Sequence, residues 1–218
     1  MSDAVVVLSG GMDSTVLAHH VRKELNLEIT CLSFNYGQRH EKELQMAEWQ
    51  ANELDAPHKI IQLDLGYNSS ALTNVLKNVP TMEDVLGHPQ PPTYVPNRNM
   101  ILLSIAAGVA EDLDARGVYY GAHRSDQYGY WDTTSDFLEA INFVIGLNRL
   151  NQIEIVAPFV EYTKTHILEM GLKLNVDFSK TWTCYVGEEK ACGKCPTCAE
   201  RLKTFRDLGR VDPLSYQS

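Results

Sequence analysis

The stretch AVVVLSGGMDST, residues 4–15, decides the fold of this chain. Residues 4–8 are apolar and mostly β-branched, and the small residues after them form the kind of tight loop that ends a buried strand. Apolar residues then recur at a spacing of four over residues 17–25, which predicts one helix that stops near Asn26. A strand, a glycine loop and a helix therefore follow one another.

The same alternation continues along the chain. Further strands are predicted over residues 28–35, 58–63, 118–120 and 153–156, and helices over residues 41–54, 99–113, 137–150, 163–174 and 197–208. Strands that alternate with helices pair in parallel through right-handed crossovers. The sequence thus predicts an α/β fold with a parallel sheet. We expect one main domain, residues 1–178, and a C-terminal segment, residues 179–218.

A proline-rich segment, residues 64–96, interrupts this alternation. Its prolines break any long element, and they are Pro80, Pro89, Pro91, Pro92 and Pro96. Connections of this length in compact domains are usually either disordered or functional. We therefore predict a long loop. It is either disordered or part of an active site or an oligomer contact.

The loop after the first strand has the features of a phosphate cradle. Its glycines let the backbone approach a ligand, and the N–H groups of the loop and of the following helix point at an anion. The Lys of a Walker A loop is missing, and the G-x-G-x-x-G dinucleotide pattern is not matched. A turn with a helix cap and no ligand is the alternative. The residues predicted to bind phosphate are Leu8, Ser9, Gly10, Gly11, Met12, Asp13, Ser14 and Thr15.

The second strand ends in a polar loop, residues 33–40, at the same edge of the predicted sheet. We expect this loop to receive the adenosine half of a nucleotide, with Tyr36 and Arg39 as the contact residues. Arg39 can also pair with phosphate. A solvated loop arginine is the alternative.

Four of the five cysteines are crowded into the spacing Cys184-x7-Cys192-x2-Cys195-x2-Cys198. Four thiolates suit a tetrahedral zinc ion and leave no open position for a zinc-bound water, so the predicted role is structural. An iron–sulfur cluster and a redox dithiol are the alternatives. Cys31 stands alone in an apolar strand and is interpreted as a small buried hydrophobe.

The amino-acid composition of the chain limits the classes of molecule that it can bind. The formal net charge of −9 at pH 7 and the lack of a basic run argue against stable nucleic-acid binding and favour a small-molecule substrate. No apolar stretch approaches the length of a membrane span, and the first residues lack the pattern of a signal peptide. We expect a cytoplasmic protein with no membrane contact.

The glycine loop matches the S-G-G-x-D-S signature of the PP-loop ATP pyrophosphatase superfamily without departure, and the chain resembles that superfamily. The resemblance implies that the loop holds the pyrophosphate end of ATP while a substrate oxygen attacks the α-phosphate, with Mg²⁺ bridging the phosphates. It implies that Asp13 orients the loop or the metal and that Lys164 reaches the phosphates. An ordinary exposed helix lysine is the alternative for Lys164.

Three further segments, residues 94–99, 121–123 and 181–185, narrow the resemblance to the 7-cyano-7-deazaguanine synthase family over nearly the whole chain. This resemblance implies a Rossmann-like parallel sheet, with an ATP-binding domain over residues 1–178 and a C-terminal zinc knuckle over residues 179–218. It implies a homodimer, and zinc held by the four clustered cysteines. It also implies the substrates 7-carboxy-7-deazaguanine and ammonia. One ATP activates the carboxylate for amide formation, and a second ATP activates the amide oxygen so that water is formally lost.

The chain departs from the family at one place. Family members commonly read Tyr-Pro-Asp-Cys-Arg before a helix, whereas this chain reads Tyr-Trp-Asp-Thr-Thr over residues 130–134. We predict that Asp132 accepts hydrogen bonds from the donor edge of the deazaguanine ring; a helix cap is the alternative. The missing arginine leaves open whether the product is nitrile or amide.

Two other classes of function share part of this pattern. A tRNA-thiolating PP-loop enzyme would show a basic surface and a persulfide-carrying cysteine, which the acidic charge balance and the zinc-like spacing disfavour. A non-catalytic nucleotide sensor would keep much of the same loop. Only a product assay separates a sensor from an enzyme.

Overall fold

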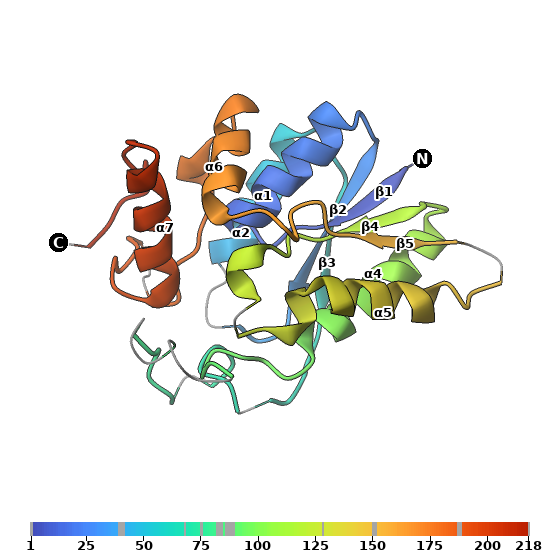
Figure 1. Ribbon diagram of the computed structural model, residues 1–218, viewed down its shortest axis with the longest axis horizontal. Helices are drawn as coiled ribbons and strands as arrows, with labels where there is room; N and C mark the ends of the chain where they lie inside the picture. Colours follow the sequence, from blue (N-terminus) through green and yellow to red (C-terminus); the bar gives the residue numbers. More distant parts are fainter. Residues whose placement is uncertain are drawn as a thin grey trace.

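The computed structural model of the protein describes residues 2–38, 42–67, 69–74, 76–81, 85, 90–127, 129–149, 152–186 and 189–217. Within these residues, parallel strands form one sheet in the order β3-β2-β1-β4-β5. The strands are β1 (Ala4–Val7), β2 (Ile29–Asn35), β3 (His58–Gln62), β4 (Gly117–Tyr119) and β5 (Glu154–Val156). Figure 1 shows this sheet with helices on both faces. The predicted α/β fold and its parallel sheet are confirmed.

The predicted helices are present, with shifts of one or two residues at most ends. They are α1 (Met12–His19), α2 (Lys42–Glu53), α4 (Arg98–Asp112), α5 (Ser135–Ile145), α6 (Lys164–Lys173) and α7 (Pro196–Asp207). A π-helical turn, His20–Glu24, extends α1. The prediction that α5 runs to residue 150 is wrong, because the chain leaves the helix at Gly146. No helix within the described residues has the length and apolar character that a membrane crossing requires.

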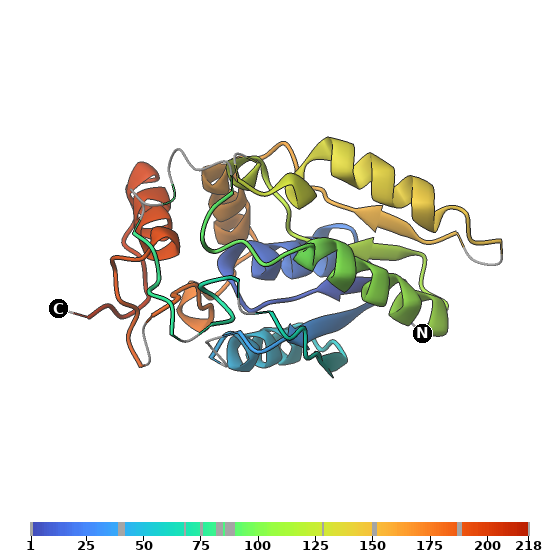
Figure 2. The same ribbon diagram turned by 90° about the horizontal axis from the view of Figure 1, so that it is seen from below.

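Two apolar layers hold the sheet between them. Successive side chains of a strand point to opposite faces, and in β1 the side chain of Val6 packs with α1, α2 and α6 while that of Val5 packs with α4 and α5. Figures 1 and 2 show these two groups of helices on opposite sides of the sheet. Burial on both faces explains why the central strands β1 and β2 are largely apolar along their length.

The change of face between β1 and β4 creates the place for a site. The helix after β1 covers one face of the sheet and the helix after β4 covers the other. The chain therefore leaves the carboxyl ends of these neighbouring strands toward opposite faces. Parallel sheets bind ligands in the crevice at such a switch point, outside the carboxyl ends of the strands. The predicted phosphate loop leaves β1 at this point.

The C-terminal segment packs beside the same crevice. The backbone N–H of Trp182 donates to the carbonyl of Gly10 at 2.9 Å, which joins this segment to the loop after β1. The fully buried Arg201 of α7 forms a two-pronged ion pair with Asp212, with Nε to Oδ2 at 2.8 Å and Nη2 to Oδ1 at 3.0 Å. This pair fixes the end of the chain against α7.

Candidate active site

Serine hydroxyls close the loop between β1 and α1 on itself. The Oγ atoms of Ser9 and Ser14 are 2.9 Å apart. The N–H of Ser9 donates to Ser14 Oγ at 3.1 Å, and the N–H of Gly11 donates to Ser9 Oγ at 3.2 Å. The first N–H groups of α1 have no acceptor inside the helix and remain available for an anion.

Gly10 lets α2 approach this loop. Its φ of 84° lies in the left-handed region that glycine adopts without strain. A Cβ atom there would lie 2.0 Å from the backbone oxygen of Glu43 and 2.8 Å from the backbone nitrogen of Ala47. Only glycine therefore fits, and α2 brings Glu43 to the crevice as a result.

A cavity of about 290 Å³ opens at this crevice. Its walls come from the loop after β1, the loop after β2, the starts of α2, α4, α6 and α7, and the segment after β4. Leu72 and Thr93 of the proline-rich segment also line it, and Thr93 Oγ1 lies 2.6 Å from the hydroxyl of Tyr130. The geometry therefore favours the reading in which this long loop contributes to a site.

Charged side chains from distant parts of the sequence meet in one half of the cavity. Lys164 Nζ lies 2.6 Å from Glu200 Oε2 and 3.5 Å from Asp13 Oδ2. His123 Nε2 lies 3.5 Å from Asp13 Oδ2 and 3.4 Å from Asp126 Oδ2. We name these five residues the charge cluster.

Mutual pairing sets the protonation states in the charge cluster. Burial alone would raise the pKa of Asp13, but Lys164 and His123 hold that pKa well below its usual range. Burial would lower the pKa of Lys164, but Asp13, Glu200 and Asp126 raise it above its ordinary value. Burial raises the pKa of Asp126. Asp13 is thus ionised and Lys164 protonated at neutral pH.

One oxygen of the charge cluster has no protein partner. Asp13 Oδ1 is buried and accepts no hydrogen bond from the described residues, although its other oxygen faces Lys164 and His123. Carboxylate oxygens are ligands that hard cations such as Mg²⁺ prefer. Three carboxylates facing a phosphate loop also need added positive charge before polyphosphate can bind. The donor set therefore fits a divalent cation carried in with phosphate.

The other half of the cavity contains a different set of side chains. Arg98 reaches in from the start of α4, with Nη1 3.4 Å from the hydroxyl of Tyr36. Glu43 reaches in from α2, and burial raises the pKa of its carboxyl to about 7 although Arg98 lowers it. The hydroxyl of Tyr120 is buried here with no hydrogen-bond partner among the described residues.

The structure brings most of the predicted ATP-site residues to this cavity. Those that line it are Leu8, Ser9, Gly11, Asp13, Ser14, Tyr36 and Lys164. Three others do not line it. Gly10 backs onto α2, Met12 belongs to the apolar core, and the hydroxyl of Thr15 is buried without a partner among the described groups. Arg39 lies outside the described residues.

Asp132 is buried close to the cavity but does not line it. Its Oδ2 accepts the backbone N–H of Asn99 at 3.1 Å, at the second residue of α4. The expected alternative, a cap on the following helix, belongs instead to Thr134, whose Oγ1 accepts the N–H of Phe137 at 3.2 Å. The geometry therefore places Asp132 beside the start of α4, where it interacts with the charge of Arg98. Tyr130 and Thr133 are the residues of this segment that line the cavity.

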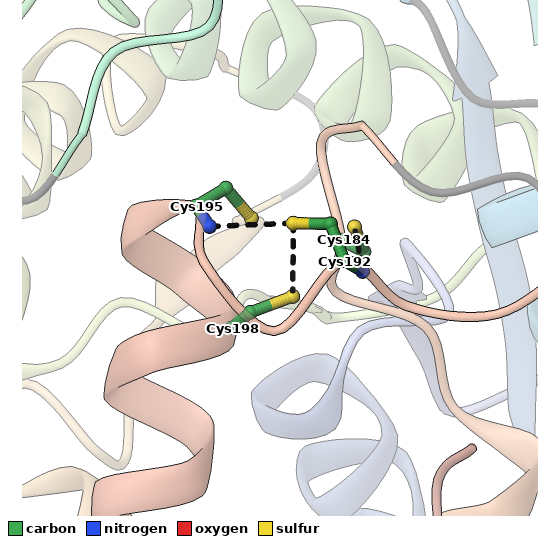
Figure 3. A group of neighbouring side chains, drawn as sticks. All are labelled: Cys184, Cys192, Cys195 and Cys198. Atoms are coloured by element: carbon green, nitrogen blue, oxygen red, sulfur yellow. Dashed lines mark hydrogen bonds between the residues drawn. The ribbon is translucent and has the colours of Figure 1, made fainter. Parts of the chain in front are cut away.

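The four clustered cysteines form a compact, buried sulfur site. Their Sγ atoms all lie within 4.8 Å of one another, and Figure 3 shows the side chains gathered at the start of α7. Backbone N–H groups point at the sulfurs, including those of Cys192 and Val186 toward Cys184 at 3.2 and 3.3 Å. A tetrahedral ion with bonds of about 2.3 Å needs sulfurs about 3.8 Å apart. The set fits one metal ion, whereas a four-iron cluster binds each cysteine to a different iron and needs wider spacing.

The sulfur site and the cavity share residues of α7. Thr197 lines the cavity and its Oγ1 donates to the carbonyl of Thr183 at 2.7 Å. One helical turn from Thr197 and only two residues after Cys198, Glu200 holds Lys164. The helix that begins at the cysteines therefore also carries part of the charge cluster.

Reasoning from the sequence missed several cavity residues. They are His123, Asp126, Glu200 and Glu43, for which the sequence predicts no role at a site. His123 and Arg98 lie in segments that carry the family resemblance, which was the available signal. Glu43 and Glu200 resemble solvated helix acids, so only the tertiary fold identifies them.

Comparison with known proteins identifies the family of this chain. The profile of the family described as "Queuosine biosynthesis protein QueC" matches residues 3–209. A protein of Alteromonas mediterranea named 7-cyano-7-deazaguanine synthase is 45% identical over 225 residues, with 100% of each chain covered. One of the same name from Caldicellulosiruptor saccharolyticus is 44% identical, covering 98% of this chain and 95% of the relative.

Solved structures share the fold at low sequence identity. The U34-tRNA thiolase NcsA from Methanococcus maripaludis superimposes with a TM-score of 0.52 at 15% identity, covering 94% of this chain and 64% of that one. NMN synthetase from Francisella tularensis gives a TM-score of 0.51 at 16% identity, covering 84% and 65%. These likenesses bear on the fold alone. The full-length sequence match decides the family, and the chain belongs to the queuosine biosynthesis protein QueC family of enzymes.

Proposed function

We propose that this chain is an ATP-dependent carbon–nitrogen ligase that converts 7-carboxy-7-deazaguanine and ammonia to 7-cyano-7-deazaguanine, in queuosine- or archaeosine-type deazapurine biosynthesis. The observation that carries the proposal is the meeting of Asp13 and Lys164, 3.5 Å apart, beside the S-G-G-x-D-S loop on the wall of one cavity. The names of full-length relatives at 43–45% identity support the product.

In this proposal the protein positions ATP and stabilises charge. The loop and the start of α1 bind the pyrophosphate end of ATP, and Lys164, held by Glu200, neutralises charge that develops on the departing pyrophosphate. A substrate carboxylate oxygen attacks the α-phosphate, and the bond to pyrophosphate breaks. Ammonia then displaces AMP to give the amide. The amide oxygen repeats the attack on a second ATP, and loss of AMP and protons leaves the nitrile.

One cavity can serve both steps, because the carboxylate and the amide each present an oxygen to the same phosphate. Mg²⁺, when bound, supplies positive charge to the phosphates. Asp13, through its unpartnered Oδ1, and Asp126 are the residues that would hold it.

We propose zinc as the ion of the sulfur site formed by Cys184, Cys192, Cys195 and Cys198. Four sulfurs within 4.8 Å of one another support a single tetrahedral ion with a structural role. The free, closely spaced thiols also support a reducing compartment, the cytoplasm. Elemental analysis of purified protein tests the metal.

We also propose a homodimer that uses α5. Three large apolar side chains of this helix and the turn after it are mostly exposed, namely Phe143, Val144 and Leu147. Exposed apolar side chains grouped in this way support a protein contact. Sedimentation of the wild type and of Phe143→Asp tests the assignment, and equal masses for the two proteins would contradict it.

The experiment that tests the proposed function is mass spectrometry of the product formed from 7-carboxy-7-deazaguanine, ATP and ammonium. The expected nitrile forms with two AMP and two pyrophosphate per product molecule. Release of ADP and phosphate would contradict the adenylation chemistry. A non-catalytic nucleotide sensor would form no product.

An amide-forming ligase is the second candidate. It is favoured by Thr133 and Thr134, which stand where family members commonly have Cys-Arg, and Thr133 lines the cavity. In that case the same assay would accumulate the amide with one AMP per molecule. A tRNA-modifying role has no comparable support, since the net charge is −9.

A further inference from the structure

The cavity contains two charged groups that the adenylation chemistry does not use. Glu43 and Arg98 line it from α2 and α4, while every member of the charge cluster has an ion-pair partner. Within the described part of the chain, the Glu43 carboxylate makes no hydrogen bond and no ion pair, and Arg98 makes only two long hydrogen bonds, to Tyr36 and Asn99, each at 3.4 Å.

The Glu43 carboxylate is costly to bury without a hydrogen-bond donor, because it loses hydration that the nearby charge of Arg98 offsets only in part. Arg98 keeps N–H donors that its two long hydrogen bonds do not use. The elevated pKa of Glu43, about 7, reports this cost. A ligand that offers N–H donors to Glu43 and an acceptor to Arg98 would remove it.

We infer that Glu43 and Arg98 read the ring edge of the deazaguanine substrate, an inference that rests on the proposed function. A guanine-type edge presents two adjacent N–H donors, at N1 and at the exocyclic amino group, with the carbonyl O6 beside them. A carboxylate accepts both donors through its two oxygens, and a guanidinium donates to O6. An adenine edge has one donor group followed by a ring acceptor, so it satisfies Glu43 only in part. The pair is therefore assigned to the deazaguanine and not to ATP.

The hydroxyl of Tyr120 extends the assigned surface. It is 95% buried, lines the cavity and has no partner among the described groups, so it can donate to or accept from the same ligand. A site with several unpaired polar groups discriminates strongly, because a mismatched ligand leaves them unpaired.

Calorimetric titration of Glu43→Gln with 7-carboxy-7-deazaguanine and, separately, with a non-hydrolysable ATP analogue tests the assignment. Glutamine keeps the shape but offers one acceptor oxygen instead of two. The Kd for the deazaguanine should rise on the order of 10- to 100-fold, while the Kd for the nucleotide changes by less than about two-fold. Glu48→Gln, an exposed position on the same helix, is the matched control and should change neither Kd.

A ligand variant tests the same point without a protein variant. Wild-type protein should bind the 2-deamino analogue, 7-carboxy-7-deazahypoxanthine, on the order of 10-fold more weakly than the deazaguanine, and Glu43→Gln should discriminate less between the two. Equal wild-type affinity for both ligands, or a Glu43→Gln effect confined to the nucleotide, overturns the inference. If wild-type protein binds no deazaguanine at all, the proposed function fails as well.

Discussion

The backbone oxygen of Glu43 occupies the space that a side chain on Gly10 would need, since a Cβ atom there would lie 2.0 Å from it. Gly10→Ala should therefore push α2 away from the loop and add left-handed backbone strain. We expect a loss of more than about 2 kcal/mol in the free energy of unfolding and a large loss of ATP affinity.

Denaturant unfolding and ATP titration measure this effect. Gly108→Ala is the matched control, because nothing lies within 4 Å of a Cβ at that position in α4. Alanine there should leave ATP binding unchanged and stabilise the helix by about 0.5–1 kcal/mol. Normal ATP binding by Gly10→Ala would contradict the close approach.

Asp13→Asn should lower kcat by at least about 100-fold while the protein still folds, because the amide removes the charge beside the phosphate loop and Lys164 keeps Glu200. The pKa of Asp13 is below its usual range, so the folded state favours the ionised form. The stability this contributes is present at neutral pH and is lost as the pH falls through and below about 4, the ordinary carboxyl pKa.

The stability difference between wild type and Asp13→Asn should accordingly shrink in acid. Denaturant unfolding at several pH values measures it. Glu169→Gln, which breaks the exposed Glu169–Lys173 pair, is the control and should change stability by less than about 0.5 kcal/mol at any pH. Unimpaired turnover in Asp13→Asn would reject the assigned role.

Cys198→Ser should reduce the bound metal from about one ion per chain, loosen α7 and weaken ATP binding, because Glu200 lies on that helix. Elemental analysis, hydrogen exchange over residues 196–207 and ATP titration measure the three effects. Cys31→Ala, in the apolar core, should leave the metal content unchanged. If the purified protein is brown and contains iron and acid-labile sulfide, the site holds an iron–sulfur cluster and the assignment of zinc is wrong.

The affinity for 7-carboxy-7-deazaguanine should increase about ten-fold between pH 6 and pH 8. Burial raises the pKa of Glu43 to about 7, so acid protonates the group that must accept the N–H donors. Arg98 and Tyr185, which interact with it electrostatically, have pKa values above their ordinary ones, so both stay protonated over this range. Titration of Glu43→Gln subtracts the contribution of His123 and Asp126, and an identical pH profile in that variant would exclude Glu43 as the titrating group.

Asp132→Asn distinguishes direct ring recognition from positioning. Because Asp132 accepts the Asn99 N–H at the start of α4, we expect a loss of about 1 kcal/mol in stability and a weaker effect on deazaguanine affinity than Glu43→Gln produces. Asp136→Asn on α5 is the exposed control. A large loss of deazaguanine affinity at unchanged stability would instead support the recognition predicted from the sequence.

The fold was readable from the sequence because short apolar runs alternate with segments of helical length and periodicity. Val5 and Val6 face different cores, and this two-sided burial makes the run continuous. The loop was equally readable, since its chemistry is local. Asp13 and Lys164 were predicted together, but only through family resemblance.

The rest of the site depends on distances that no local pattern encodes. Glu43 and Glu200 lie on helices whose sequence pattern does not distinguish them from solvent-exposed acidic residues. Only the packing of α2 and α7 at the edge of the sheet directs them toward the cavity. Asp132 was placed at the ligand because its carboxylate suits a guanine edge. The sequence does not reveal that α4 begins directly beside it and takes its hydrogen bond.

The hydrogen bond between Trp182 and Gly10, together with the Lys164–Glu200 ion pair, has a consequence for folding during synthesis of the chain. During translation the phosphate loop emerges first, yet the helix bearing Glu200 is made nearly 190 residues later. A nascent chain on the ribosome thus holds an incomplete form of the proposed nucleotide site, and we expect ATP to bind productively only after the cysteine segment has left the exit tunnel and folded.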